Sequence, residues 1–294
     1  MNELLRARSW GVVFSALFRG QKVIIKKIQK PGAATVVQNT KAALACFDRA
    51  LGHDPYRVSR CHATLPGQGL IITEFVDGRT LHEELQSASG KHRNRILTRL
   101  GGWLEQAATI RTEGPDSTVF SPDWTLSQLA GLPYDSYPAE ERAILQSLFH
   151  ALTRFGTLHR GTDMRLCGGH DDFHAQNFIW TDAALWAIDV EAYRQQPAAK
   201  MLGNFLGWEA MHSPCSRSPA SSPPLFGTRA CDIDALTAAV QLRPDEKNVT
   251  VPFFLIARQL ESLFPASKKP LRRQENIARA KILLHDLCTL MDRE

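Results

Sequence analysis

Residues 170–180 read HDDFHAQNFIW, and residues 184–191 read ALWAIDVE. The first stretch sets two histidines, two adjacent aspartates and an asparagine close together, and an apolar run follows at once. The two apolar runs are short and are separated by Thr181–Asp182, which is typical of a β-hairpin. Because Gly168–Gly169 come directly before the polar residues, we expect a loop rather than a helix there. The stretch therefore predicts a polar loop, then a hairpin whose second strand ends at Asp189.

Two simple hypotheses compete for the polar loop. His170 and His174 are four residues apart, which is the spacing of two metal ligands on one face of a helix. A loop gives that spacing no special geometry, so a histidine metal site is not favoured. In the other hypothesis the loop is a polar turn, whose Asp and Asn side chains satisfy nearby backbone groups.

The third hypothesis is the catalytic loop of a phosphoryl-transfer enzyme. Such loops follow the pattern H-x-D-x-x-x-x-N, and an apolar strand that ends in Asp comes after them. His170, Asp172 and Asn177 fit this spacing, and Asp189 follows twelve residues beyond Asn177. The presence of all four residues favours this hypothesis over a chance match.

The chemistry assigns a role to each of these residues, because phosphoryl transfer depends mainly on positioning and on stabilisation of charge. Asp172 is predicted to accept a hydrogen bond from the acceptor hydroxyl and to take its proton late, and His170 is the other predicted catalytic residue. Asn177 and Asp189 are predicted to supply oxygen ligands to Mg²⁺. Glu191 lies on the same face as Asp189 if the strand continues, so it is a candidate for a further metal ligand. Alternatively, Glu191 is a solvent-facing acid.

An early hairpin adds independent support. Residues 11–28 contain two β-rich runs with a turn at Arg19–Gly20. VIIK at 23–26 is similar to the strand V-A-I-K, whose lysine contacts the α- and β-phosphates of ATP. Lys26 is therefore predicted to bind the nucleotide, whereas Lys27 has the opposite strand parity and is predicted to face away. The alternative is that Lys26 is a solvated residue of an edge strand.

The first 80 residues are predicted to be rich in strands, and the rest of the chain to be mainly helical. The spacing of apolar residues predicts a helix over 33–51. LIITEF predicts a strand, followed by a turn at Asp77–Gly78 and a helix capped by Thr80. Longer helices are predicted at about 92–112, 138–160 and 271–291. Residues 213–229 are rich in Ser and Pro and are predicted to form a long mobile loop.

Composition narrows the class of protein. The six cysteines are widely spread and include no CxxC pair, so neither a zinc ribbon nor a disulfide framework is indicated. The net charge of +5 would suit an anionic ligand, but no stripe of basic and aromatic residues indicates nucleic acid. No apolar run is long enough for a membrane span, and the N-terminus lacks the apolar segment of a signal peptide. The sequence therefore predicts a soluble, cytoplasmic protein.

HDDFHAQNFIW and LWAIDVE resemble the HGDxHxxN and IDxE signatures of the aminoglycoside phosphotransferase and choline/ethanolamine kinase-like superfamily. The resemblance implies an α+β, two-lobed protein-kinase-like fold. It has a small β-rich N-terminal nucleotide-binding lobe, residues 1–78, and a larger, mainly helical C-terminal lobe, residues 79–294, with the catalytic loop and the substrate pocket. It also implies a hinge near Glu74–Gly78, where backbone groups at Glu74 and Val76 would hold the adenine of ATP.

The chain departs from the superfamily pattern in three places. Asp171 stands where Gly is usual. No acid is present near Gln38–Lys41, where a helix Glu would pair with the strand lysine. Lys26 is therefore expected either to be held by Gln38, by Asn39 or, if the helix is shifted, by Asp48, or to be poorly held. Lys200 stands near the place of an expected Asp.

The resemblance implies ATP- and Mg²⁺-dependent transfer of the γ-phosphate to a hydroxyl of a small molecule, such as an amino alcohol, a sugar or a similar metabolite. The missing helix acid motivates an alternative, a catalytically degenerate protein of the same fold that binds a nucleotide or a partner. Asp172, Asn177 and Asp189 oppose that alternative, because a binding module has no chemical need for all three.

Overall fold

The computed structural model describes residues 3–110, 114–212, 224–264 and 270–293. The chain divides into two compact units, each built from several segments. The first unit comprises Met1–Ser89, Arg99–Gly114 and Cys167–Gln196, and the second comprises Gly90–Thr98, Pro115–Leu166 and Pro197–Glu294. The whole of the predicted N-terminal lobe lies in the first unit, and the lobe boundary after residue 78 stays a prediction.

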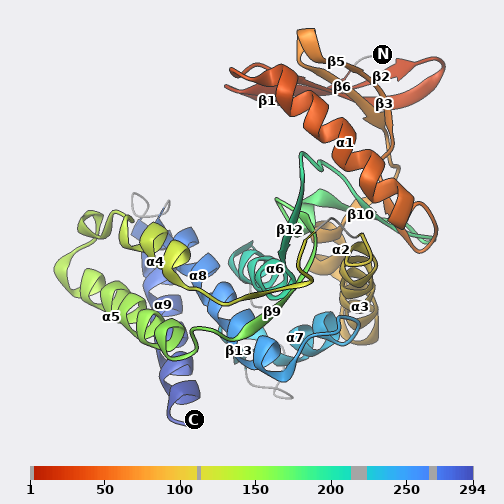
Figure 1. The fold of residues 1–294 in the computed structure, drawn as a ribbon. Coiled ribbons are helices and arrows are strands. Elements are labelled where there is room, and N and C mark those ends of the chain that lie inside the picture. The colour runs from red at the N-terminus through yellow and green to blue at the C-terminus, as the bar shows by residue number, and fades with distance from the viewer. Residues whose placement is uncertain (1–2, 111–113, 213–223, 265–269, 294) are drawn as a thin grey trace. The chain divides into compact units, whose positions relative to one another are not determined.

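A five-stranded antiparallel sheet opens the chain, with the strand order β1-β2-β3-β6-β5 (Figure 1). Its strands are β1 (Glu3–Arg8), β2 (Gly11–Phe18), β3 (Gln21–Ile28), β5 (Cys61–Leu65) and β6 (Leu70–Glu74). The predicted hairpin is confirmed, since β2 and β3 pair along their whole length. Arg19 and Gly20 have φ values of 53° and 78°. Two successive positive φ values give the two-residue turn whose twist matches that of the strands.

Helix α1 (Ala33–Leu51) lies across one face of this sheet (Figure 1) and confirms the predicted helix. Val37 of α1 packs with Ile28 and Ile71 of the sheet in one buried cluster. Phe47 is also fully buried on α1. The apolar stripe of the helix is therefore what holds it on the sheet.

A second sheet in the same unit has four short strands in the order β4-β11-β10-β7. They are β4 (Tyr56–Val58), β7 (Arg79–Thr80), β10 (Phe178–Trp180) and β11 (Leu185–Ala187). β10 and β11 are the hairpin predicted after the polar loop, with Phe178 opposite Ala187. The predicted end of the second strand at Asp189 is wrong, because β11 ends at Ala187 and Asp189 has a φ of 58°. The chain therefore turns at Asp189.

The polar loop begins where β9 (Asp163–His170) ends, and it closes with the short 3-10 helix η3 (Ala175–Asn177). β9 lies beside β12 (Tyr193–Pro197), the strand that follows the turn at Asp189. The loop thus contains no α-helix, as predicted.

Helix α2 (Leu81–Ser87) begins as the sequence predicts. The Oγ1 of Thr80 accepts a hydrogen bond from the N–H of Glu83 at 3.2 Å, and the Glu83 carboxylate accepts one from the N–H of Thr80 at 2.9 Å. This capping box fixes the segment that follows the predicted hinge. Gly78 sits against β10, because a Cβ there would lie 2.6 Å from the carbonyl oxygen of Trp180.

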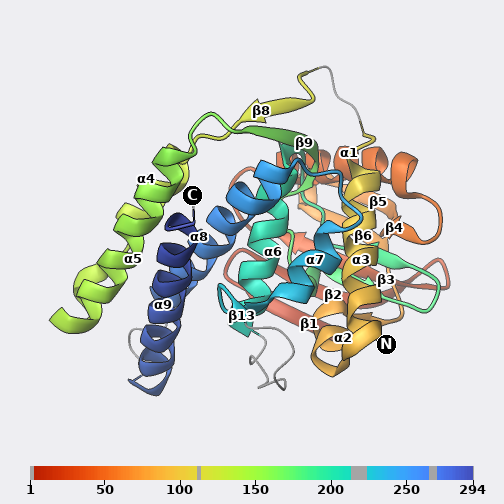
Figure 2. The ribbon, with the colours of Figure 1, turned by 90° about the horizontal axis from the view of Figure 1, so that it is seen from below.

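The second unit is mainly helical. Its helices are α4 (Asp123–Ala130), α5 (Ala139–Leu158), α6 (Ala198–His212), α7 (Ala230–Thr237), α8 (Val251–Leu263) and α9 (Pro270–Met291), and α3 (Gly90–Ala107) begins in it. Figure 2 shows α6 beside α8 and α5 beside α9. The strand β8 (Ser117–Val119) pairs with the start of β9. Helices are confirmed near 92–112, 138–160 and 271–291, although the first of them ends at Ala107.

Part of the predicted Ser- and Pro-rich loop, residues 213–223, lies outside the described residues. The remainder is a short hairpin of β13 (Pro224–Leu225) and β14 (Thr228–Arg229). Its turn residue Phe226 is buried, donates its N–H to Asp286 at 2.7 Å and accepts a hydrogen bond from Gln259 at 2.8 Å. This end of the segment is therefore tethered to helices of the second unit.

Among the residues that the structure describes, no helix is both long and apolar enough to cross a membrane. The described cysteines form no disulfide bond.

The close contact between Gly78 and β10 allows a test of the packing before α2. Gly78→Ala would press a Cβ against the backbone of Trp180 and the side chain of Ile179. We expect the free energy of unfolding, measured by urea denaturation, to fall by about 1–3 kcal/mol. Gly67→Ala is the control, because nothing lies within 4 Å of a Cβ at Gly67. Equal stability of the two variants would contradict the packing described here.

Candidate functional site

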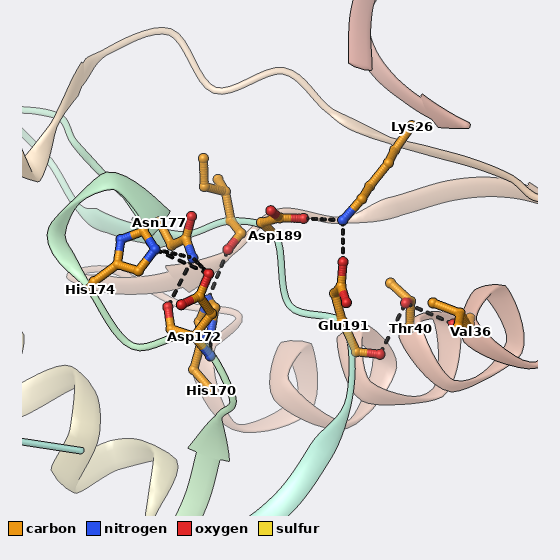
Figure 3. A network of polar contacts seen from close by, with 10 residues as sticks. Lys26, Val36, Thr40, His170, Asp172, His174, Asn177, Asp189 and Glu191 are labelled. Atoms are coloured by element: carbon orange, nitrogen blue, oxygen red, sulfur yellow. Dashed lines mark hydrogen bonds and ion pairs between the residues drawn. The ribbon is translucent and has the colours of Figure 1, made fainter. Parts of the chain in front are cut away.

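The β10–β11 hairpin brings two of the predicted site residues together in the first unit (Figure 3). Asn177 comes directly before β10, and Ile188 and Asp189 come directly after β11. The N–H of Ile188 donates to the carbonyl oxygen of Asn177 at 2.9 Å. The hairpin register therefore sets Asn177 next to the turn that carries Asp189.

His170 links the polar loop to the same turn. Its Nε2 lies 2.8 Å from the carbonyl oxygen of Ile188, and its Nδ1 accepts the N–H of Asp172 at 3.3 Å. These partners place the ring proton on Nε2. The side chain is buried, and burial lowers its pKa, so the ring is neutral at physiological pH. These contacts fix the ring of His170 between the polar loop and the turn, and a catalytic role for it stays a prediction.

Asp172 is held by two neighbours within the loop. Its Oδ2 lies 3.1 Å from the Nε2 of His174 and accepts a hydrogen bond from the Nδ2 of Asn177, also at 3.1 Å. The contact with His174, reinforced by Asn177, outweighs partial burial and lowers the pKa of Asp172 from 3.8 to about 2. The side chain is 65% exposed. Asp172 is thus an ionised carboxylate that a solute can reach.

The orientation of Asn177 follows from its hydrogen bonds. Its Nδ2 donates to both the carbonyl and the carboxylate of Asp172, at 2.9 and 3.1 Å. Both partners are acceptors, so they fix which end of the amide carries the nitrogen. Figure 3 shows that the amide oxygen of Asn177 points away from Asp172. That oxygen is the kind of group that Mg²⁺ takes as a ligand.

Lys26 reaches across to the turn after β11. Its Nζ forms ion pairs with Asp189, at 2.6 Å, and with Glu191 (Figure 3). The Lys26 side chain is only 12% exposed. Burial alone would lower its pKa, but the two carboxylates outweigh burial and raise the pKa above the usual 10.5. Lys26 is therefore a partly buried cation with two counter-ions.

This arrangement settles two expectations from the sequence. β3 lies between β2 and β6, so the alternative that Lys26 is a solvated residue of an edge strand is wrong. The expectation that Gln38, Asn39 or Asp48 holds Lys26 is also wrong, because its partners are Asp189 and Glu191. Lys27 is exposed, as predicted.

Asp171, at a position where Gly is usual in the superfamily, has partners on β12. Its Oδ1 accepts a hydrogen bond from Gln196 at 2.8 Å, and its Oδ2 lies 3.4 Å from the Nε of Arg194. The sequence does not predict this contact. The only sequence feature that could have indicated it is the spacing of Arg194 and Gln196, because residues two apart on a strand share a face.

The predicted hinge is the connection between β6 and β7. Glu74 is the last residue of β6, where its N–H donates to the carbonyl of Arg60 at 2.9 Å. Phe75 follows, with the Nζ of Lys22 3.8 Å from its ring centroid. A role for Glu74 and Val76 in holding adenine stays a prediction.

Lys200 belongs to helix α6 of the second unit. Its Nζ lies 5.0 Å from the ring centroid of Trp124, an exposed residue of α4. This contact suits a cation over an aromatic face.

The histidine metal hypothesis does not fit the loop. The Nδ1 of His174 accepts the N–H of Gln176 at 3.2 Å and its Nε2 faces Asp172, while both nitrogens of His170 have backbone partners. The two rings therefore face different groups. Within the described ranges, no group of three or more His, Cys, Asp and Glu residues is arranged to hold a metal ion.

No family model matches the sequence, and no curated protein matches it. Solved structures are similar over almost the whole chain. The aminoglycoside phosphotransferase APH(4)-Ia aligns with a TM-score of 0.62 at 11% identity, covering 97% of this chain and 93% of that one. The amicoumacin kinase hAmiN aligns with a TM-score of 0.61 at 13% identity, covering 96% and 88%. The choline kinase of Cryptosporidium parvum Iowa II aligns with a TM-score of 0.59 at 14% identity, covering 100% and 90%.

The chain has the fold of these kinases. The predicted α+β, two-lobed protein-kinase-like fold, and the predicted likeness to aminoglycoside phosphotransferases and choline/ethanolamine kinases, are thereby confirmed. At 11–15% identity the likeness establishes the fold alone, so the activity has to be argued from the side chains.

The low pKa of Asp172 depends first on His174, which gives a direct test. In His174→Ala, we expect the pKa of Asp172 to rise from about 2 toward 3.8. A carboxylate with a lowered pKa stabilises the fold above about pH 4 and loses that contribution as the pH falls through its folded pKa. In the variant the folded and unfolded pKa values of Asp172 nearly coincide, so this contribution and its loss at low pH should largely disappear.

NMR titration of ¹³C-labelled aspartate carboxyls measures this pKa. His62→Ala, at an exposed position of β5, is the control and should leave it unchanged. An Asp172 that still titrates near pH 2 in His174→Ala would show that the contact with His174 is not what lowers its pKa.

Proposed function

We propose that the protein is an ATP-dependent phosphotransferase that moves the γ-phosphate to a hydroxyl of a small molecule. The observation that carries the proposal is the grouping of Asp172, Asn177, Asp189 and Lys26 around one hairpin, on a fold shared with known kinases. A carboxylate, an amide, a second carboxylate and a lysine are the groups that phosphoryl transfer uses.

Asp172 is the proposed base. Its contacts with His174 and Asn177 engage Oδ2, which leaves Oδ1 to accept a hydrogen bond from a substrate hydroxyl. A carboxylate with a pKa near 2 is a weak base, so it orients the hydroxyl first and accepts the proton only late in the transfer. This sequence of events suits a loose transition state, in which bond making to the attacking oxygen is slight.

Lys26 is the proposed contact with the nucleotide phosphates. Its ammonium is held at a fixed place by carboxylates and carries its charge at any physiological pH. A fixed cation lowers the energy of charge that develops on phosphate oxygens. The backbone near Glu74 and Val76 is proposed to bind the adenine.

Asn177 and Asp189 are the proposed ligands of Mg²⁺. The fit rests on the amide oxygen of Asn177, which its hydrogen bonds turn away from Asp172, and on Asp189, which lies in the turn that the hairpin register sets next to Asn177. Mg²⁺ is commonly held by one or two carboxylates together with substrate phosphates. When bound, the ion would neutralise phosphate charge. The solved structure of hAmiN with AMP-PNP, Ca²⁺ and its substrate supports the use of a nucleotide and a divalent cation.

The similar structures support a choice of substrate class. They are named as kinases or phosphotransferases of aminoglycosides, of choline and of amicoumacin. An amino alcohol, a sugar or a similar hydroxyl-bearing metabolite is therefore the proposed acceptor. A cytoplasmic location, where ATP is available, fits this activity.

The alternative, a degenerate binding protein, was favoured by the absence of a helix acid to hold Lys26. In this chain Asp189 and Glu191 hold Lys26 instead. The missing acid therefore no longer argues against catalysis.

Replacement of Asp172 tests the proposal. The wild type is screened with Mg²⁺ and ATP against amino alcohols, sugars and aminoglycosides, and phosphorylated products are detected by mass spectrometry. In Asp172→Asn we expect the turnover number to fall by about 10²–10⁴-fold, because the base is lost. The dissociation constant for ATP should stay nearly unchanged.

Asp182→Asn is the matched control, because Asp182 is an exposed aspartate in the turn between β10 and β11. If Asp172→Asn turns over substrate about as fast as this control, Asp172 is not the base. A wild type that binds no ATP and phosphorylates none of the acceptors would favour the degenerate alternative.

A further inference from the structure

Helix α1, which lacks the acid that the superfamily carries there, contacts the segment that contains Glu191. In this helix Thr40 falls within the stretch from Gln38 to Lys41 and is buried. Its Oγ1 lies 3.0 Å from the carbonyl oxygen of Glu191 and 2.9 Å from that of Val36 one turn earlier. The helix therefore contacts the backbone of the very residue whose carboxylate reaches Lys26 (Figure 3).

The backbone at Glu191 is fixed by the two residues before it and by a hydrogen bond to its carbonyl oxygen. Val190, the residue before it, is buried, and the positive φ of Asp189 turns the chain away from the line of β11. The one hydroxyl proton of Thr40 is shared between the carbonyl oxygens of Glu191 and Val36, so the hydroxyl links the Glu191 backbone to α1. The Glu191 carboxylate is thus presented to Lys26 by a fixed backbone and not by a free surface side chain.

We propose that Glu191 is a positioning residue that anchors Lys26 and takes the place of the missing helix acid, with Thr40 tying that anchor to α1. The inference rests on the proposed function, in which Lys26 binds phosphates. It replaces the role of a further metal ligand that the sequence predicted for Glu191.

Charge balance favours this role. Lys26 is a largely buried cation, and a buried charge left without a counter-ion is costly. Two carboxylates contact it, and Asp189 is the proposed metal ligand of the pair. With the Asp189 carboxylate committed to a metal ion, Glu191 remains to neutralise and hold Lys26. In this arrangement Asp189 would serve the metal ion and Glu191 would serve Lys26, so each acid of the turn has one cation.

The first experiment measures the anchor without any need for activity. Competitive acetylation with trace acetic anhydride, read by mass spectrometry, reports the fraction of each lysine that is neutral and reachable. In Glu191→Gln, an isosteric change that removes the charge, we expect Lys26 to be acetylated about tenfold faster, as one opposite charge commonly shifts a pKa by a unit or more. Lys27 on the same strand, exposed and of opposite parity, is the internal control.

Thr40→Val tests the link to α1. Valine keeps the size of threonine but removes the hydroxyl that donates to Glu191. We expect acetylation of Lys26 to rise in the same direction as in Glu191→Gln, by a smaller factor, with Lys27 again unchanged. If Lys26 is acetylated at the same rate in Thr40→Val as in the wild type, the link between α1 and Glu191 does not help to anchor Lys26.

The second experiment separates an anchor from a metal ligand. Where an acceptor is found, the turnover number is measured for Glu191→Gln, Lys26→Met and the double variant. Glu191→Gln should lower turnover about tenfold or more in the wild-type background and cause little further loss beside Lys26→Met, because two residues that act as a unit are not additive. The Mg²⁺ concentration for half-maximal activity should stay within about twofold.

Unchanged acetylation of Lys26 in Glu191→Gln would overturn the proposal. A large rise in that Mg²⁺ concentration would also overturn it and would restore the metal-ligand role of Glu191. If the protein proves to have no kinase activity, the acetylation result still decides whether Glu191 anchors Lys26. Failure of the proposed function and failure of the anchor are therefore distinguishable.

Discussion

The ion pair between Lys26 and Asp189 is the interaction on which the candidate site depends. It joins β3 of the first sheet to the turn after β11, residues that lie 163 positions apart in the chain. Two such groups meet only if the hairpin, the five-stranded sheet and the turn at Asp189 are all formed. Once they are, a single cation and its carboxylates lie at the place where we propose that nucleotide phosphates bind.

A second set of contacts sets the polar loop relative to that turn. The buried, neutral ring of His170 bridges the carbonyl of Ile188 and the N–H of Asp172, and the hairpin sets Asn177 beside Ile188. Asp172 is then left exposed and ionised, while His170 and Asn177 beside it are buried. Rigid support beneath a reachable carboxylate is what positioning of a substrate hydroxyl requires.

Much of this could be predicted from the sequence because the signals are local. The turn at Arg19–Gly20, the periodicity of α1, the capping box at Thr80 and the spacing from His170 to Asn177 are each encoded within a few residues. The likeness to small-molecule kinases came from two short motifs, and the solved structures confirm the fold.

What could not be predicted depends on contacts between distant segments. Strand alternation placed Asp189 and Glu191 on one face of a continuing strand, but β11 ends at Ala187 and Asp189 takes a left-handed conformation. Both carboxylates reach Lys26 through that turn and not through strand geometry. No pattern in the sequence shows a turn of this kind at an aspartate, although aspartate tolerates positive φ better than most residues.

The most direct test of a nucleotide site at Lys26 and Asp189 is calorimetry of ATP binding with and without Mg²⁺, for the wild type and for Asp189→Asn. Asparagine is chosen because it tolerates the φ of 58° and removes only the charge. The account predicts that Mg²⁺ strengthens ATP binding by the wild type and by the Asp182→Asn control, and that this gain is lost in Asp189→Asn. The same Mg²⁺ dependence in Asp189→Asn, or no binding of ATP by the wild type, would contradict it.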